Sequence, residues 1–422
     1  MIRSSLGKLS AWGGLASLSV LDQALVSGTN FAVHLLLARW LPPGEFGLFA
    51  LIFSTFVIVA GFHEALVLEP MSVFGPSKYR EDLMGYLTSL LRLQARFGVV
   101  PICSILLAAG ASWVAGWQAT GAALLGIGIA FPLMLVFLTL RRYFYLLSRP
   151  GTALSGGLLY LGATVTTLGL LAASSVVSPF MAFVALAMGS VVGSLLLALR
   201  AQRTRPDASS REWKQVPRDH WIFGRWLVVS SALFIASTQA QLFLAAGFLG
   251  LRAAGAFRAM QTLVLPFVQI VTAIGSLGLP VLSRDFGRGQ LGAVRKKGMT
   301  IGLTLIAGAI AYEIALLVFR QPLEQLVYGG KFADFTWLLP VLGLLGILVA
   351  LTTGYSLILR AVQRPKHYLF ATSASALAGV TSAALFTWLW GLSGAAASLL
   401  LSYAAAAIAG AVLYSRWWRE VL

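Results

Sequence analysis

The chain has 422 residues, of which 58% are hydrophobic and only 11% are charged, and its mean hydropathy is +0.85. A soluble domain is about 25% charged, so a soluble fold cannot hide this much apolar surface, and lipid must act as solvent for most of the chain. The single cysteine, Cys103, excludes an intramolecular disulfide and a cysteine-based metal cluster. The composition therefore predicts an all-α, polytopic membrane protein without a sizeable soluble domain.

The N-terminus carries two basic residues and then an apolar run, which resembles a signal peptide. No convincing small-residue cleavage site follows, and the helix pattern continues through Asp22 to about Ala38, so we expect a retained first span. A span needs roughly 20 mostly apolar residues. About twelve stretches qualify: 15–38, 46–69, 86–110, 118–140, 152–174, 178–200, 222–247, 256–281, 298–319, 335–358, 367–389 and 393–415.

A polar interval, RAQRTRPDASSREWKQVPRDH (200–220), divides the chain near its middle. We interpret it as a basic cytoplasmic linker (201–221) between a six-helix N-terminal lobe (1–200) and a six-helix C-terminal lobe (222–422). The strings LPPGEFGLFA (41–50) and LGLRAAGAFR (249–258) align between the lobes and match Gly47 with Gly255. Because each lobe has an even number of spans, the copies run parallel, which predicts a pseudo-two-fold axis along the membrane normal.

The basic residues are distributed unevenly between the two sides of the membrane. If the N-terminus is inside, 24 of the 31 lysines and arginines fall on the inner side and five on the outer side. Positive charge concentrates in cytoplasmic loops, so this bias predicts that both termini are cytoplasmic. Arg141 and Arg142 are counted here among the inner residues.

A polar stripe follows the first span. Its members share one helix face at i, i+4, i+7 and i+11: Gln23, Ser27, Asn30 and His34. Gln241, with Ser237, gives the seventh span a similar face, and Gln269 does so in the eighth. Such faces either make interhelical hydrogen bonds or line a shared cavity. Equivalent helices of both lobes carry them, which favours the cavity.

Charged side chains inside spans mark functional sites by default. Arg92 and Arg96 lie at i and i+4 in the third span, at a depth comparable to Glu64 in the second. Two hypotheses stay open: the arginines pair with Glu64 as structural ion pairs, or they bind an anionic substrate, since a guanidinium donates bidentate hydrogen bonds to phosphate. Asp22 and Glu64 are candidate ion-coupling residues, and Glu313 is a further candidate proton site.

Three arginines lie at the outer ends of spans: Arg39, Arg252 and Arg258. They either bind phosphate late in transport or extend to the outer membrane interface. No P-loop, H-E-x-x-H or G-x-S-x-G motif is present. We therefore expect no enzymatic activity, no cofactor, no metal site and no nucleic-acid partner.

The first two spans carry a family resemblance. QALVSGTNFAVHLLLARWLPPGEFGLFALIFSTF, followed by GFHEALVLEPMSV, resembles bacterial Wzx-type polysaccharide flippases of the multidrug/oligosaccharidyl-lipid/polysaccharide (MOP) exporter superfamily. The match covers about the first 75 residues, and RYFYLLSRP (142–150) is also similar. The resemblance implies two six-helix lobes in a V around a central cavity, in a bacterial inner membrane. Relatives often have fourteen spans, two more than this chain.

The resemblance also implies the substrate, an oligosaccharide linked to undecaprenyl pyrophosphate that moves from the inner to the outer leaflet, with a glycan polymerase and assembly proteins as possible partners. We expect the polar stripes to hydrogen-bond sugar, and Arg92, Arg96 or Arg39 to neutralise pyrophosphate. A cation-coupled multidrug exporter of the same superfamily is the alternative, but it would favour an acidic, aromatic cavity. A membrane glycan polymerase or ligase would need a larger outer loop than the sequence provides.

Overall fold

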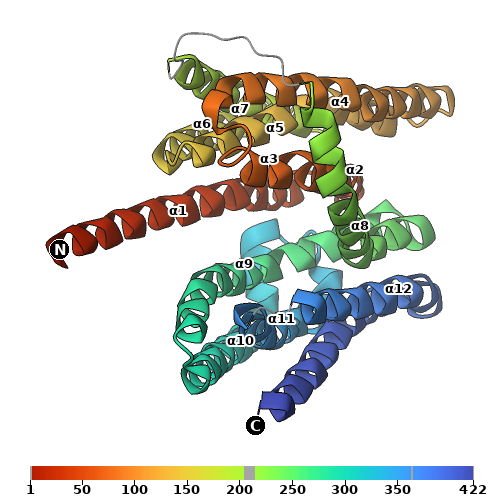
Figure 1. The fold of residues 1–422 in the computed structure, drawn as a ribbon. Coiled ribbons are helices and arrows are strands. Elements are labelled where there is room, and N and C mark those ends of the chain that lie inside the picture. The colour runs from red at the N-terminus through yellow and green to blue at the C-terminus, as the bar shows by residue number, and fades with distance from the viewer. Residues whose placement is uncertain (1, 204–213, 363–364, 422) are drawn as a thin grey trace. The chain divides into compact units, whose positions relative to one another are not determined.

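A computed structural model describes residues 2–203, 214–362 and 365–421, and they form an all-helical fold without strands (Figure 1). The N-terminal helices are α1 (Ile2–Trp40), α2 (Pro43–His63), η1 (Glu64–Leu68), α3 (Glu69–Phe74), η2 (Arg80–Asp82), α4 (Leu83–Val114), α5 (Gln118–Leu146), α6 (Pro150–Ala173) and α7 (Pro179–Gln202). They are followed by α8 (Val216–Leu249), α9 (Leu251–Gly287), α10 (Leu291–Tyr328), η3 (Ala333–Phe335), α11 (Leu338–Ala361) and α12 (Pro365–Val421).

Each of the twelve expected spans overlaps one of these helices. Expected span 46–69 runs continuously through α2, η1 and α3, and the last two spans lie in α12 on either side of Gly391, whose positive φ of 58° breaks the helix. Among the described residues, nine helical stretches are long and apolar enough to cross a membrane, or ten if the bent α8 counts as one. The prediction of a polytopic, all-α membrane protein is thus confirmed.

Local sequence signals set several helix ends. Asp82 caps α4 by accepting a hydrogen bond of 2.7 Å from the Gly85 amide, and Ser178 caps α7 in the same way through the Met181 amide. Pro150 and Pro179 occupy the first turns of α6 and α7, where a missing N–H costs nothing. These residues begin α4, α6 and α7 directly after the short connections that the hydropathy pattern predicts.

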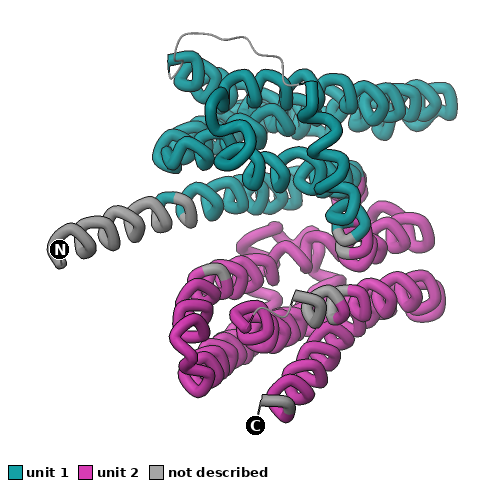
Figure 2. The backbone as a smooth tube through the Cα atoms, in the orientation of Figure 1, with its two compact units in different colours: residues 1–41, 52–231 teal, residues 42–51, 232–422 magenta. Residues whose placement is uncertain are grey.

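The described chain divides into two compact units (Figure 2). Unit 1 comprises residues 1–41 and 52–231, and unit 2 comprises 42–51 and 232–422. The boundaries fall inside α2 and inside α8, so each of these helices contributes to both units. Of the expected linker, residues 204–213 lie outside the described part, whereas 216–221 form the first turns of α8 and pack within unit 1.

Each unit has its own aromatic core. In unit 1, α5 packs against α4 and α7, α6 packs against α1 and α7, and Phe131 and Phe183 are fully buried. In unit 2, α11 packs against α9, α10 and α12, with Phe257 and Tyr328 in the interior. Large apolar side chains such as Leu107 remain exposed on the outer helix faces, as expected where lipid is the solvent.

Candidate functional site

The C-terminal third of α5 carries two arginines that form ion pairs within unit 1. Arg141 and Arg142 follow each other on the helix, and successive residues of an α-helix point about 100° apart. The two guanidinium groups therefore reach different neighbours: Arg141 pairs with Asp22 of α1, and Arg142 pairs with Glu64 of η1. Two carboxylates that the sequence places inside spans thus find their partners on a single helix.

The first pair is fully buried. Arg141 Nη2 lies 2.5 Å from Asp22 Oδ2, and the Tyr145 hydroxyl donates a second hydrogen bond of 2.5 Å to the same oxygen. The Asp22 carboxylate is completely inaccessible, and its Oδ1 has no hydrogen-bond partner among the described residues. The Arg141 guanidinium also lies over the Phe137 ring at 5.7 Å. Removing either charge would leave the other buried and unpaired, which is strongly unfavourable.

The second pair is partly accessible. Arg142 Nη2 lies 2.5 Å from Glu64 Oε1, and Nη1 donates to the Ser72 hydroxyl at 3.3 Å. The Arg142 and Glu64 side chains are 32% and 42% exposed, so a solute can reach them. Glu64 opens η1, a five-residue π-helix, and π-helical turns often accompany functional sites.

A neutral polar triad lies beside this pair. His63, the residue before Glu64, places Nε2 3.2 Å from Gln94 Oε1 and 3.3 Å from the Thr139 hydroxyl. Thr139 also donates to Gln94 Oε1 at 2.8 Å. All three side chains are buried, and His63 Nδ1 has no hydrogen-bond partner among the described residues. The triad joins the end of α2 to α4 and α5, directly before the Glu64–Arg142 pair in the chain.

The expected polar stripe of α1 changes character along the helix. Gln23 is exposed and Ser27 is partly exposed. Asn30 lies 3.5 Å from the Tyr160 hydroxyl of α6, and Tyr160 stacks on Phe137. His34 is buried, with Nδ1 2.8 Å from the Asn30 carbonyl and its ring edge-on to Phe53. The exposed end of the stripe is open to a ligand, and the buried end packs within unit 1.

The other expected site residues lie on the surfaces of their own units. Arg39, Arg92, Arg96 and Gln269 are exposed. The possible pairing of Glu64 with Arg92 or Arg96 is wrong, because Glu64 pairs with Arg142 instead. Arg92 and Arg96 lie on a face of α4 that Gln94 does not share, so the Gln94 side packs inward while the arginines point outward.

In unit 2, the candidate polar side chains are separated. Gln241 is fully buried and donates to the Ser237 carbonyl at 3.1 Å, which is packing within the unit. Arg258 is also buried and donates to Gln261 Oε1 at 3.0 Å. Glu313 is half-buried, and its Oε2 has no hydrogen-bond partner among the described residues. The described residues hold no group of three or more His, Cys, Asp or Glu side chains suited to a metal ion.

The first turns of α8 are fastened to unit 1 by a second polar network. Asp219 accepts hydrogen bonds from Tyr79 and, at 2.6 Å, from Lys78. Burial raises the pKa of the Tyr79 hydroxyl, and the carboxylate beside it adds to this effect, so the hydroxyl stays protonated and donates. His220 Nδ1 donates to the Leu66 carbonyl at 2.8 Å, and the Tyr86 hydroxyl lies 2.6 Å from Nε2.

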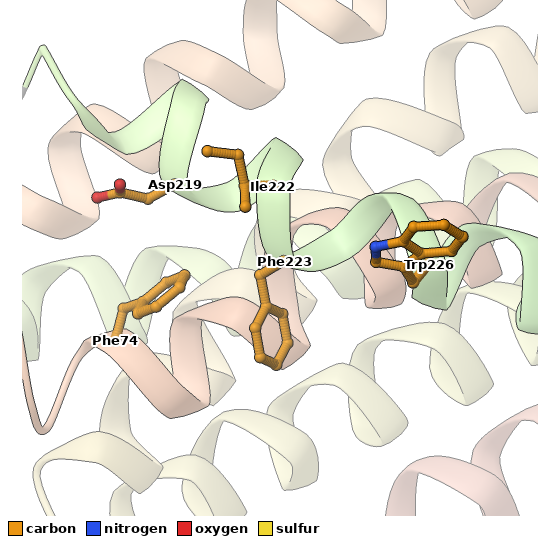
Figure 3. Close-up of a pocket in the computed structure, with 5 residues that line it drawn as sticks. All are labelled: Phe74, Asp219, Ile222, Phe223 and Trp226. Carbon is orange, nitrogen blue, oxygen red and sulfur yellow. The ribbon is translucent and has the colours of Figure 1, made fainter. Parts of the chain in front are cut away.

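Because a carbonyl can only accept, His220 carries its hydrogen on Nδ1 and accepts from Tyr86 through Nε2 in the neutral ring. The Leu66 carbonyl belongs to η1, where π-helical spacing alters the main-chain bonding. Figure 3 shows a pocket at the same turns, lined by Phe74, Asp219, Ile222, Phe223 and Trp226, with the Phe74 and Phe223 rings 5.5 Å apart. We call residues 216–226 the α8 arm.

Sequence reasoning assigned Arg141 and Arg142 to the inner loop and did not single out Tyr145 or Thr139. The signal was present: two carboxylates inside spans require cationic partners, and Arg141 and Tyr145 share a helix face at i and i+4. The expected span ended at residue 140 because hydropathy falls at the two arginines, but α5 continues to Leu146.

No protein-family model matches the chain, and no curated protein matches it. Solved structures do. The chain is similar to an inward-facing multidrug resistance MATE family transporter of the MOP superfamily, with a TM-score of 0.78, 13% identity, and coverage of 94% of this chain and 97% of the other. The chain has the fold of MATE family transporters.

Two further structures with this fold agree. An outward-facing multidrug resistance MATE family transporter of the MOP superfamily has a TM-score of 0.66 at 14% identity over 96% of this chain and 94% of that one. A MOP superfamily transporter from Pyrococcus furiosus Vc1 (DSM3638), described by a binding pocket of reverse polarity that suggests a different function, has a TM-score of 0.66 at 15% identity, covering 96% of this chain and 95% of that chain. Because each alignment covers nearly all of both chains, the similarity in fold extends over nearly the whole of this chain.

Proposed function

We propose that the protein is a flippase that moves an oligosaccharide linked to polyprenyl pyrophosphate from the inner to the outer leaflet of a bacterial cytoplasmic membrane. The fold of MATE family transporters supports a role in transport. The resemblance of the first 75 residues to Wzx-type flippases supports the lipid-linked substrate. The hydrocarbon tail of such a substrate can stay in the bilayer, so the protein must provide a polar path only for the sugar and the pyrophosphate.

The observation that carries this proposal is the excess of arginine within membrane-spanning helices. Arg92, Arg96, Arg141 and Arg142 lie inside candidate spans of unit 1, where Glu64 and Glu69 are the acidic residues away from the span ends, and α1 adds Asp22. Asp22 and Glu64 each pair with one arginine of α5, and Arg92 and Arg96 are exposed on α4. Cationic groups at membrane depth attract a pyrophosphate and repel a cationic drug.

The accessible end of the α1 stripe supplies neutral hydrogen-bonding groups. Gln23, Ser27 and Asn30 are at least partly exposed, and amides and hydroxyls match the donors and acceptors of a sugar. We assign sugar contact to these three residues and phosphate contact to Arg92 and Arg96. Arg39 remains a candidate for phosphate contact at the outer end of α1.

Ion coupling is assigned to the two carboxylates. Protonation of Asp22 would remove the negative charge that holds Arg141, and protonation of Glu64 would do the same for Arg142. Each freed guanidinium could then bind the anionic substrate. Protonation shifts the transport equilibrium only if the two conformations differ in proton affinity, so this role requires Asp22 or Glu64 to change its ion pair during the cycle.

The test is reconstitution of the full chain in vesicles that contain a fluorescent lipid-linked oligosaccharide. We expect the wild type to expose the sugar on the opposite leaflet, and Arg92→Gln and Arg96→Gln to slow this at least tenfold while the protein stays folded. Arg288→Gln, which removes an exposed arginine from unit 2, is the matched control. Translocation at the wild-type rate in both α4 variants would refute the phosphate role, and a rate equal to that of protein-free vesicles would refute the flippase.

A cation-coupled multidrug exporter is the second candidate, because two of the structures with this fold are described as multidrug resistance transporters. It predicts efflux of a cationic dye from the same vesicles, driven by a proton or sodium gradient. Since it requires a carboxylate that is free to bind the cation, Glu313→Gln, at the half-buried carboxylate whose Oε2 has no partner among the described residues, would abolish dye efflux, and Arg92→Gln would leave it unchanged. Dye efflux without sugar exposure would therefore favour this candidate over the flippase.

A further inference from the structure

An apolar pocket of about 260 Å³ opens on unit 1 between α2, η1, α4, α5 and the α8 arm. Its walls are built mainly from hydrocarbon and aromatic side chains: Phe62, Leu66, Leu93, Phe97, Leu135 and Trp221. Sites that enclose a whole small ligand have volumes of about 300–1,000 Å³. This smaller, open pocket is suited to one segment of a chain whose remainder lies outside it.

The polar side chains at the pocket largely satisfy each other. His63 and Gln94 bond to one another and to Thr139 beneath the pocket, and His220 bonds to Tyr86 and to the Leu66 carbonyl. His63 Nδ1 is left as an acceptor without a partner among the described residues. A sugar or a cation would need many more free polar groups, so the pocket favours hydrocarbon.

The rim of the pocket has the character of a membrane interface. Phe97 of α4 is 69% exposed and Trp221 of the α8 arm is 58% exposed, so large apolar surfaces flank the opening. Lys214, Arg218 and Arg225 are exposed on the same turns of the chain that supply Trp221 and Pro217 to the pocket. Basic residues and tryptophan at a helix end bind anionic headgroups at the surface of a bilayer.

We propose that this pocket is a binding site for an anionic glycerophospholipid of the bilayer. One acyl chain occupies the space between α4, α5 and the α8 arm, and the headgroup phosphate lies against Arg218 and its basic neighbours. The lipid joins η1 to the α8 arm from the membrane side, while the hydrogen bonds of His220 join them from within. This inference is independent of the transported substrate.

The test uses the purified full chain after removal of lipid, with phosphatidylglycerol, phosphatidylcholine and inorganic phosphate as separate probes. Native mass spectrometry counts the retained lipid, and thermal unfolding measures the stabilisation. Gly98→Leu fills the pocket, because a Cβ at Gly98 meets only the Ile102 side chain, at 3.9 Å. Gly110→Leu is the matched control on the same helix, since nothing lies within 4 Å of a Cβ there.

We expect the wild type and Gly110→Leu to retain phosphatidylglycerol, and Gly98→Leu to lose at least tenfold in affinity. Arg218→Gln, at an exposed position, should reduce the preference for phosphatidylglycerol over phosphatidylcholine several-fold, whereas Arg288→Gln in unit 2 should not. Equal retention in Gly98→Leu and Gly110→Leu would overturn the pocket. The proposed ligand would be overturned if the wild type showed no preference between the two lipids, or if phosphate alone gave the full thermal shift. If Gly98→Leu fails to fold, the lipid preference of Arg218→Gln tests the proposal instead.

Discussion

Gly47 of α2 and Gly255 of α9 lie in direct contact inside unit 2. A Cβ added to Gly47 would stand 2.9 Å from the Gly255 nitrogen and 1.9 Å from the Leu251 carbonyl oxygen, and one added to Gly255 would stand 2.3 Å from the Pro43 carbonyl oxygen. These are the two glycines that the alignment of 41–50 with 249–258 matches. The positions that correspond in sequence are therefore the positions at which the two helices touch.

We expect Gly47→Ala and Gly255→Ala to destabilise the protein, because the new methyl group meets main-chain atoms that cannot move independently. Overpacking of this kind costs about 1–3 kcal/mol. Thermal unfolding of the purified variants measures the loss. Gly44→Ala, with nothing within 4 Å of its Cβ, controls for the substitution itself and should unfold at or above the wild-type temperature. Wild-type stability in Gly47→Ala would contradict the close approach.

The Asp22–Arg141 pair should behave as a coupled unit. Breaking a buried ion pair by removing one partner costs about 3–5 kcal/mol, whereas replacing both with apolar residues of similar volume is often neutral. Asp22→Leu and Arg141→Met should each lower the free energy of unfolding strongly, and the double variant should recover most of it. A double-mutant cycle in denaturant measures the coupling.

The control for that cycle is the exposed pair between Arg252 and Asp334, whose side chains are 66% and 82% accessible and 3.6 Å apart. Surface pairs contribute about 0–1 kcal/mol, so Arg252→Gln should change stability little. A cycle for Asp22 and Arg141 with no more coupling than this surface pair would show that the buried bridge is energetically minor.

His220 should determine how tightly the α8 arm is held. His220→Phe keeps the aromatic bulk but leaves the Leu66 carbonyl and the Tyr86 hydroxyl without their partner, at a cost of about 1–3 kcal/mol for each buried group left unsatisfied. We expect amide hydrogen exchange to accelerate in 216–226 and in 64–68. Trp226→Phe, at a position that is 71% exposed, is the control. Unchanged exchange in η1 would mean that the arm is held mainly by the Asp219 contacts.

The predicted orientation of the membrane protein is open to cysteine labelling. In a Cys103→Ser background, Ser174→Cys lies between α6 and α7, and Ser77→Cys lies between α3 and α4. Both serines are exposed. With cytoplasmic termini, a membrane-impermeant maleimide should label Ser174→Cys in intact cells and Ser77→Cys only after the membrane is opened. The reverse pattern would show that the charge bias does not set the topology.

The lengths of the apolar stretches and the polar residues between them were sufficient to predict the helices, because a bilayer leaves few other ways to satisfy the hydrogen bonds of the backbone. The partners of the charged residues could not be predicted in the same way. Depth and periodicity place Glu64 beside Arg92 as readily as beside Arg142, and only the packing of η1 on α5 distinguishes them. The pairing of Arg141 was missed for a different reason. Hydropathy falls at charged residues, so the expected span ends before Arg141, although the buried ion pair with Asp22 lets the helix continue.

The five residues of η1 have a consequence for the whole stretch from Pro43 to Phe74. A π-helical turn bonds residue i to i+5, as Glu69 N–H does to the Glu64 carbonyl, so it contains one residue more than an α-helical turn. That residue shifts the angular phase of everything after it by about 100°. In a cysteine or alanine scan along this stretch, the sensitive positions before and after 64–68 will therefore both repeat with the helical period, but the second set will be rotated relative to the first. A single helical projection of the whole stretch will assign the residues at one end to the wrong helix face.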